Sequence, residues 1–294
     1  MRSYLKKRDD FMEVLVTGAS GNVGAYVVEE LSRRGERVVA AGTDVDKLKR
    51  RFGEQARPVV LDLTDPGTYP GALAGVDRVF LIRPPHLGKP EDLYPFIDAL
   101  KEHGIQLVAF LSLMGVEKNP FPPHHKIEKY IEAAGLPYAH IRPGFFMQNL
   151  SGIHAAEIKA MNQVFIPAGK SRTSFIDAAD IGLAAATVLR DPKVYTNTCY
   201  TLTGAESLDY DQVAEILSRV TGRNITYARP GLWKYRQYYI RQRKLDPSYV
   251  NVTVALYLMT RLGTAAAVTP DFTQLTGREP RSLEDFVRRH VDCF

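Results

Sequence analysis

Residues 14–24 read Val14-Leu15-Val16-Thr17-Gly18-Ala19-Ser20-Gly21-Asn22-Val23-Gly24. A short β-rich run leads here into a glycine-rich turn, and a helical pattern follows. Gly18 permits a tight turn, Gly21 lets backbone N–H groups approach a pyrophosphate, and Gly24 lets the helix pack closely against the first strand. The stretch therefore predicts a cofactor-binding turn for a dinucleotide, made of Thr17, Gly18, Ser20, Gly21, Asn22, Val23 and Gly24.

Three glycines at a fixed spacing are a weak signal alone, and the pattern around them strengthens it. Between Glu13 and Arg142, nearly continuous apolar runs alternate with helical patterns, as expected for a parallel sheet covered on both faces. The expected strands are Val14–Thr17, Arg37–Ala41, Pro58–Asp62, Arg78–Ile82, Leu107–Ser112 and Tyr138–Arg142. The expected helices lie near Val23–Arg34, Val45–Phe52, Glu91–His103 and His125–Ala134. We predict an α/β chain with a Rossmann-like, doubly wound parallel sheet.

The alternation stops after Pro143, where helical patterns dominate and strand-like pieces are short. We expect residues 12–150 to form the NAD(P)-binding domain, with 174–190 packing back onto it. Residues 151–294 should form a smaller, mostly helical lobe for a substrate or partner. Residues 1–11 precede the first strand of the sheet and are expected to be a disordered extension.

The end of the second expected strand bears on the choice of cofactor. Asp44 precedes a helical pattern, so we expect it to cap that helix rather than bind a ribose as the acid of an NAD site does. Lys47 lies one turn into that helix and could reach a 2′-phosphate, which favours NADP and leaves NAD open. Asp62 ends the third strand, where it could meet the adenine ring or cap its own turn. The cofactor-binding candidates after these strands are Thr43, Lys47, Asp62, Leu63 and Arg83.

Four further motifs follow the glycine turn in order along the chain: Phe110–Gly115, His125–Glu132, Ile141–Asn149 and Phe175–Ile181. With these motifs, the chain from about Met12 to Phe294 resembles the NmrA-like family of atypical short-chain dehydrogenase/reductases. The resemblance implies a Rossmann fold and an NAD(P) cofactor. The family contains NAD(P)H-dependent quinone reductases and also non-catalytic redox sensors that bind a protein partner.

The resemblance also raises the question of a proton donor. Ordinary short-chain dehydrogenases use the tyrosine of a Tyr-x-x-x-Lys motif; here the lysine position falls on Lys126, and Pro122 stands where the tyrosine would be. Isoflavone-reductase relatives use a lysine after strand five, which implies a catalytic and cofactor-binding Lys126. Ser112 ends strand five and could hydrogen-bond a substrate carbonyl. The alternatives are a solvated helix lysine and a strand-end serine without a catalytic role.

We therefore expect an oxidoreductase that transfers hydride from NAD(P)H to a quinone or similar small carbonyl acceptor. The alternative is a regulatory protein that senses the dinucleotide without turnover. Aromatic and amide side chains after strand six could line a flat apolar pocket, and packing between the two lobes is the competing interpretation. The substrate-binding candidates there are Gly144, Phe145, Phe146 and Asn149.

Composition limits the remaining function classes. The chain has 294 residues, a formal net charge of +5 and two cysteines outside any metal-ligand spacing, so we expect no metal site and a cytoplasmic protein. No apolar run is long enough for a membrane span. Residues 231–245 hold five basic residues and no acid, but a solvated helix face explains them better than nucleic-acid binding. A homo-oligomer or a regulatory protein partner stays open.

Overall fold

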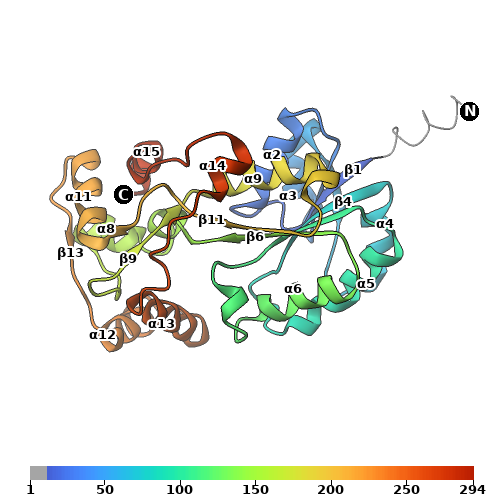
Figure 1. Ribbon diagram of the computed structural model, residues 1–294. Coiled ribbons are helices and arrows are strands. Elements are labelled where there is room, and N and C mark those ends of the chain that lie inside the picture. Colours follow the sequence, from blue (N-terminus) through green and yellow to red (C-terminus); the bar gives the residue numbers. More distant parts are fainter. Residues whose placement is uncertain (1–11) are drawn as a thin grey trace, which may run out of the picture. The chain divides into compact units, whose positions relative to one another are not determined.

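The computed structural model describes residues 12–294, so the expected extension over residues 1–11 lies outside the described part. A parallel sheet with the strand order β11-β6-β5-β4-β1-β2-β3 dominates the first of two compact units (Figure 1). Its strands are β1 (Glu13–Val16), β2 (Val38–Gly42), β3 (Arg57–Val60), β4 (Val76–Ile82), β5 (Leu107–Leu111), β6 (Tyr138–Pro143) and β11 (Thr198–Leu202). The predicted doubly wound α/β fold is confirmed, because the strand order reverses between β1 and β4.

Helices cover both faces of this sheet because its strands are apolar on both sides. They are α2 (Gly24–Arg33), α3 (Val45–Phe52), α4 (Tyr69–Leu73), α5 (Tyr94–Glu102), α6 (Pro123–Ala133) and α9 (Ala178–Arg190). In Figure 1, α2 and α9 lie on one face, and α5 and α6 lie on the other. On the second face, Phe96, Ile127 and Ile131 are fully buried in a core that also contains Val108 and Phe110 of β5.

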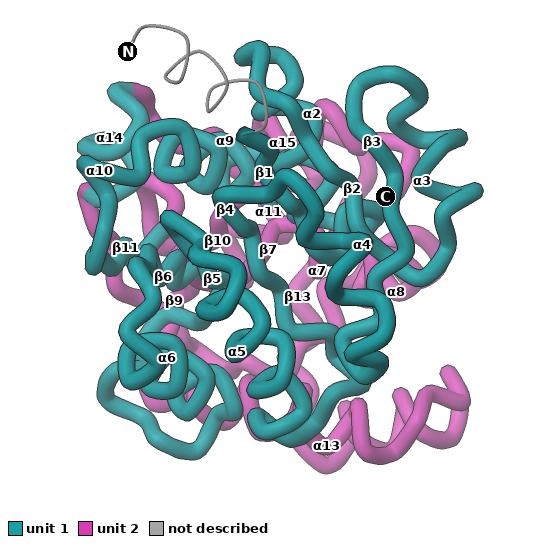
Figure 2. The backbone as a smooth tube through the Cα atoms, turned by 90° about the vertical axis from the view of Figure 1, so that its right-hand side faces the viewer, with its two compact units in different colours: residues 1–143, 178–202, 271–277 teal, residues 144–177, 203–270, 278–294 magenta. Residues whose placement is uncertain are grey.

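The first unit is discontinuous in sequence. It runs to Pro143 and takes in Ala178–Leu202 and Asp271–Gly277 (teal in Figure 2). The expected first boundary is residue 150, whereas the contacts divide the chain after Pro143. Residues 200–202 fall within the range expected for the smaller lobe, but they belong to β11, which pairs in parallel with β6 at the edge of the main sheet.

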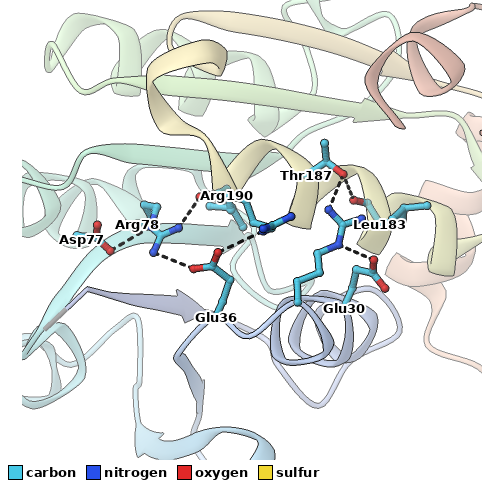
Figure 3. A network of polar contacts seen from close by, with 9 residues as sticks. Glu30, Glu36, Asp77, Arg78, Leu183, Thr187 and Arg190 are labelled. Carbon is cyan, nitrogen blue, oxygen red and sulfur yellow. Dashed lines mark hydrogen bonds and ion pairs between the residues drawn. The ribbon is translucent and has the colours of Figure 1, made fainter. Parts of the chain in front are cut away.

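A network of charged side chains joins α9 to earlier elements of the first unit (Figure 3). The guanidinium of Arg78, a nearly buried residue of β4, contacts Glu36 and Asp77 at 3.1 Å each and donates to the Leu189 carbonyl at 2.8 Å. Arg190, the last residue of α9, reaches the second Glu36 oxygen at 3.3 Å. These contacts satisfy a buried cation and hold α9 against the sheet.

The second unit comprises Gly144–Asp177, Thr203–Pro270 and Arg278–Phe294 (magenta in Figure 2). Its longer elements are α8 (Ala155–Met161), α11 (Tyr210–Thr221), α12 (Leu232–Gln237), the π-helical turn η6 (Tyr238–Gln242), α13 (Pro247–Arg261) and α15 (Leu283–Arg289). The fully buried His154 ring lies 2.9 Å from the Tyr239 hydroxyl and 2.7 Å from the Tyr257 hydroxyl. Within residues 12–294, no helix is both long and apolar enough to cross a bilayer.

Candidate functional site

The turn that follows β1 lies beside the end of β4, where the strand order reverses. The Thr17 hydroxyl donates to the Phe80 carbonyl at 3.2 Å and accepts from the Ile82 N–H at 2.8 Å. A Cβ atom on Gly18 would meet Ile82 Cδ1 at 3.6 Å. Doubly wound folds bind ligands at this switch point, outside the carboxyl ends of the strands. Thr17, a predicted cofactor ligand, is buried and joins the two strands.

The three glycines have separate roles in the turn. Gly18 has a φ of +58°, which favours glycine because side chains rarely adopt the left-handed region. The Gly21 N–H donates to the Gly18 carbonyl at 2.9 Å and closes the turn. A Cβ on Gly24 would lie only 2.3 Å from the Gly18 oxygen and 2.8 Å from its carbonyl carbon. Gly24 therefore lets the start of α2 approach the turn itself.

The N-terminus of α2 suits an anion. In the described structure, no side chain caps this helix, and its first turn contains no acid. Asn22 and Gly21 are exposed, and no hydrogen bond among residues 12–294 uses the Asn22 or Val23 N–H. Unsatisfied N–H groups and the helix dipole together make a phosphate site, so the residues present fit the pyrophosphate of a dinucleotide.

The start of α3 carries the exposed Lys47 beside two acids, Asp44 at the N-cap and Asp46 in the first turn. The Asp44 carboxylate accepts from the Lys47 N–H at 2.9 Å, so it caps α3 as the sequence indicated. Thr43 and Lys47 are exposed. The Arg51 guanidinium, which the sequence analysis did not single out, donates to the Ser20 carbonyl at 2.8 Å and so lies against the glycine turn. A run of basic residues in α3 was the available signal, but only the helix orientation shows that Arg51 reaches Ser20.

The loops after β3 and β4 hold the other cofactor candidates. Asp62 accepts from the Thr64 hydroxyl at 2.7 Å and the Thr64 N–H at 2.8 Å, and these bonds lower the pKa of its carboxyl. Leu63 is buried. Arg83 donates to the Pro84 carbonyl at 3.3 Å and also to the Leu87 carbonyl, while its Nε is buried without a partner among the described residues. Arg83 thus keeps an unused donor at the switch point.

The catalytic candidate Lys126 lies on α6, and the catalytic candidate Ser112 directly follows β5. Lys126 is exposed on the first turns of α6. Ser112 is buried. Its hydroxyl helps to lower the pKa of the Glu128 carboxyl, although it makes no hydrogen bond of ordinary geometry among the described residues. Burial raises the pKa of Glu128, but the hydrogen bonds from Arg142, at 2.9 and 2.6 Å, and the other nearby groups together lower it. This ion pair fixes α6 on β6.

Glu128, Glu132 and His140 offer ligand atoms within 4.8 Å of one another. Both carboxylates already have cations, however: Arg142 binds Glu128, and the Lys129 ammonium contacts Glu132 at 2.7 Å. Burial lowers the pKa of His140 to about 4 against the opposing charges of Glu128 and Glu132, so its ring is neutral. The charges of the group balance without a metal ion.

The substrate candidates belong to the second unit. Gly144 precedes the short strand β7 (Phe145–Phe146), which pairs in parallel with β10 (Phe175–Ile176). Phe145 packs against the core of the unit, with its ring 6.0 Å from that of Tyr257. The Asn149 carbonyl accepts from the His154 N–H at 3.2 Å. All four candidates are partly exposed, so packing and ligand contact are compatible.

Comparisons with known proteins agree with this geometry. A family model described as the NmrA-like family matches residues 12–254. The prestalk A differentiation protein A of Dictyostelium discoideum is 31% identical over 94% of this chain and 92% of its own. An NAD(P)H azoreductase from Xenophilus azovorans is 28% identical over 96% and 99%. The NADPH-dependent quinone oxidoreductase of Escherichia coli, solved with NADPH, has the same fold, with a TM-score of 0.85 at 21% identity over 95% and 99%.

Proposed function

Since this chain belongs to the NmrA-like family, we propose that it is an NAD(P)H-dependent oxidoreductase that transfers hydride to a quinone or similar small carbonyl acceptor. The family predicted from the sequence motifs is confirmed. An azoreductase among the relatives, and a quinone oxidoreductase among the solved structures, favour an enzyme. The comparisons give no support to the alternative of a sensor without turnover.

The observation that carries the proposal is the uncapped N-terminus of α2 behind a turn too crowded for a Cβ at Gly24. This turn binds the pyrophosphate through backbone N–H groups. The cofactor supplies a hydride, and the residues of the chain bind and orient it. Arg51 and Lys47 favour NADP because a 2′-phosphate gains charge-assisted hydrogen bonds there, worth about 1.5–3 kcal/mol each.

Binding measurements with both dinucleotides test this cofactor assignment. Calorimetric titration should show tighter binding of NADPH than of NADH. Arg51→Ala should weaken NADPH binding about tenfold or more and leave NADH nearly unchanged, since only NADPH carries the 2′-phosphate. Arg37→Ala is a matched control, because Arg37 is an exposed cation that pairs with Glu13 at 3.4 Å at the other end of the sheet. Equal losses for both dinucleotides would contradict the role of Arg51.

The acceptor side of the proposal rests on the partly exposed aromatic residues Phe145 and Phe146, which suit a flat apolar ring. Lys126 stays the candidate proton donor or ribose ligand, and Ser112 a candidate for the carbonyl. NADPH absorbance followed with a panel of quinones should fall over time only if the protein is an enzyme. Full activity of Lys126→Ala would show that Lys126 is neither the proton donor nor a required ribose ligand.

The cellular setting is also part of the proposal. We expect a cytoplasmic enzyme acting on a small molecule. Local contacts engage two of the five basic residues at 231–245: the Arg236 guanidinium donates to Asn251 at 2.7 Å, and Arg243 pairs with the buried Glu157. This arrangement favours a structural role for the basic run over nucleic-acid binding. Light scattering would show whether the chain forms a homo-oligomer.

A further inference from the structure

Two adjacent histidines begin α6, and the structure gives them different environments. His125 Nδ1 lies 2.9 Å from the Val116 carbonyl, which fixes its ring to the preceding turn. His124 is partly exposed, its ring centroid lies 6.0 Å from that of Phe110, and its Nδ1 is buried without a hydrogen-bond partner among the described residues. His124 therefore has hydrogen-bonding capacity that the fold does not use.

Arg83 lies close enough to His124 for its charge to affect that ring, and it has unused capacity too. Its Nη1 donates to carbonyls of its own loop, while its Nε is buried and unpartnered within residues 12–294. Arg83 directly follows Ile82, the residue that packs beside Gly18. Buried polar atoms without partners are costly, and the two on His124 and Arg83 indicate a ligand that both side chains can contact.

The charges around His124 set its chemical form. Burial, helped by the positive charge of Arg83, lowers the pKa of His124 to about 4, although the charge of Glu128 opposes the shift. The ring is thus a neutral imidazole at physiological pH, with one N–H to donate and no proton to release. Burial also lowers the pKa of Arg83, which still keeps its charge because guanidinium is so strongly basic. A neutral donor beside a fixed cation suits an oxygen that becomes negative during a reaction.

We propose that His124 is a catalytic residue that donates a hydrogen bond to the acceptor's carbonyl oxygen, with Arg83 stabilising the negative charge that develops there. This inference rests on the proposed function. The hydride forms an O–H bond with one quinone carbonyl oxygen, both carbonyl π bonds are lost as the ring becomes aromatic, and the second oxygen takes the electron pair as a phenolate. His124 and Arg83 hold that oxygen while water supplies the proton that completes the hydroquinone. No proton leaves the imidazole, and NADPH becomes NADP⁺.

The position of His124 distinguishes it from Lys126. Residues two apart on a helix point to different sides, so the two side chains do not face the same ligand. Lys126 is exposed, whereas His124 faces Phe110 at the carboxyl end of β5. The bidentate Glu128–Arg142 pair, one turn further along α6, holds this part of the helix on the sheet. It acts as a positioning pair for the imidazole.

The test combines turnover with binding of an oxyanion probe. His124→Phe keeps a ring against Phe110 and removes the N–H, and His124→Gln keeps an N–H donor. His103→Phe is the control, since His103 is exposed at the end of α5 and precedes the opposite end of β5. For each folded variant we would measure kcat with NADPH and quinones. We would also titrate 4-nitrophenol in the presence of NADP⁺, following the visible absorbance of its phenolate form.

We expect His124→Phe to lower kcat by about tenfold or more and to weaken nitrophenolate binding by a similar factor. His124→Gln should recover part of both, NADPH affinity should not change, and His103→Phe should behave as the wild type. If His124→Phe fails to fold, His124→Ala replaces it. Unchanged nitrophenolate binding in the variant without the N–H overturns the inference. A wild type that reduces no acceptor refutes the proposed function, and the nitrophenolate titration still decides the role of His124.

Discussion

Replacing Gly24 by alanine is the sharpest test of the cofactor turn. The added Cβ would lie 2.3 Å from the Gly18 carbonyl oxygen, 2.8 Å from its carbon and 3.0 Å from Ala19 Cα. All three atoms belong to the backbone, so no side chain can rotate away. The turn and the start of α2 must separate by at least about 0.7 Å, and overpacking of this kind costs about 1–3 kcal/mol of folding free energy. A displaced turn also misplaces the N–H groups that meet the pyrophosphate.

Loss of one such charge-assisted hydrogen bond costs about 1.5–3 kcal/mol, so NADPH affinity should fall tenfold or more. Calorimetric titration measures the loss of NADPH affinity, and a thermal melt measures the loss of folding stability. Gly71→Ala is the matched control, because among the described residues nothing lies within 4 Å of its added Cβ and it belongs to α4. It should be neutral or stabilise slightly. A Gly24→Ala protein with wild-type affinity and melting temperature would refute this account of the turn.

Three further predictions concern the stability of the first unit. Gly182→Ala should destabilise the protein by about 1–3 kcal/mol in a denaturant titration, because its Cβ would lie 2.5 Å from Tyr26 Cβ where α9 crosses α2. Arg142→Met should cost about 3–5 kcal/mol by leaving the Glu128 charge buried and unpaired, and a variant as stable as the wild type would contradict that pairing. His140 has a folded pKa of about 4, below its unfolded value of 6.5, so the unfolded state binds more protons between these values. Stability should therefore fall as the pH drops through that window, by at most about 1.4 kcal/mol per pH unit from this residue, and His140→Gln should flatten the slope.

The sequence was most informative where local pattern and tertiary role coincide. Among β1 to β6, all strands except the edge strand β3 are largely buried, so their apolar runs were visible, and the predicted and observed bounds differ by a few residues at most. β11 was harder to place, because Thr198–Leu202 is half-exposed at the sheet edge and contains few apolar residues. Its partner β6 is distant in the sequence, and only the pairing of Tyr200 with Ile141 reveals the register. Long-range pairing leaves little trace in a single sequence.

The glycine turn could be predicted for the same reason, because its chemistry depends on a local run of residues. The role of Arg51 could not, since it depends on the angle at which α3 returns toward Ser20. Asp62 illustrates the opposite case. Its carboxylate accepts two hydrogen bonds from Thr64, which agrees with the alternative that Asp62 caps its own turn. A polar residue at a strand end satisfies its neighbours first, and ligand contact is then an additional role.

The catalytic side shows the limit most clearly. His124 and His125 are adjacent and chemically identical, and the sequence offers no basis for preferring one over the other. The fold separates them by about one third of a helix turn, which directs His125 to the Val116 carbonyl and His124 to Phe110 and Arg83. Lys126 was a candidate because it occupies the lysine position of a family motif. Such a motif identifies the helix, but it does not show which face of the helix contacts a ligand. The side chain to examine at such a site is the one whose polar atoms the fold has buried and left without a partner.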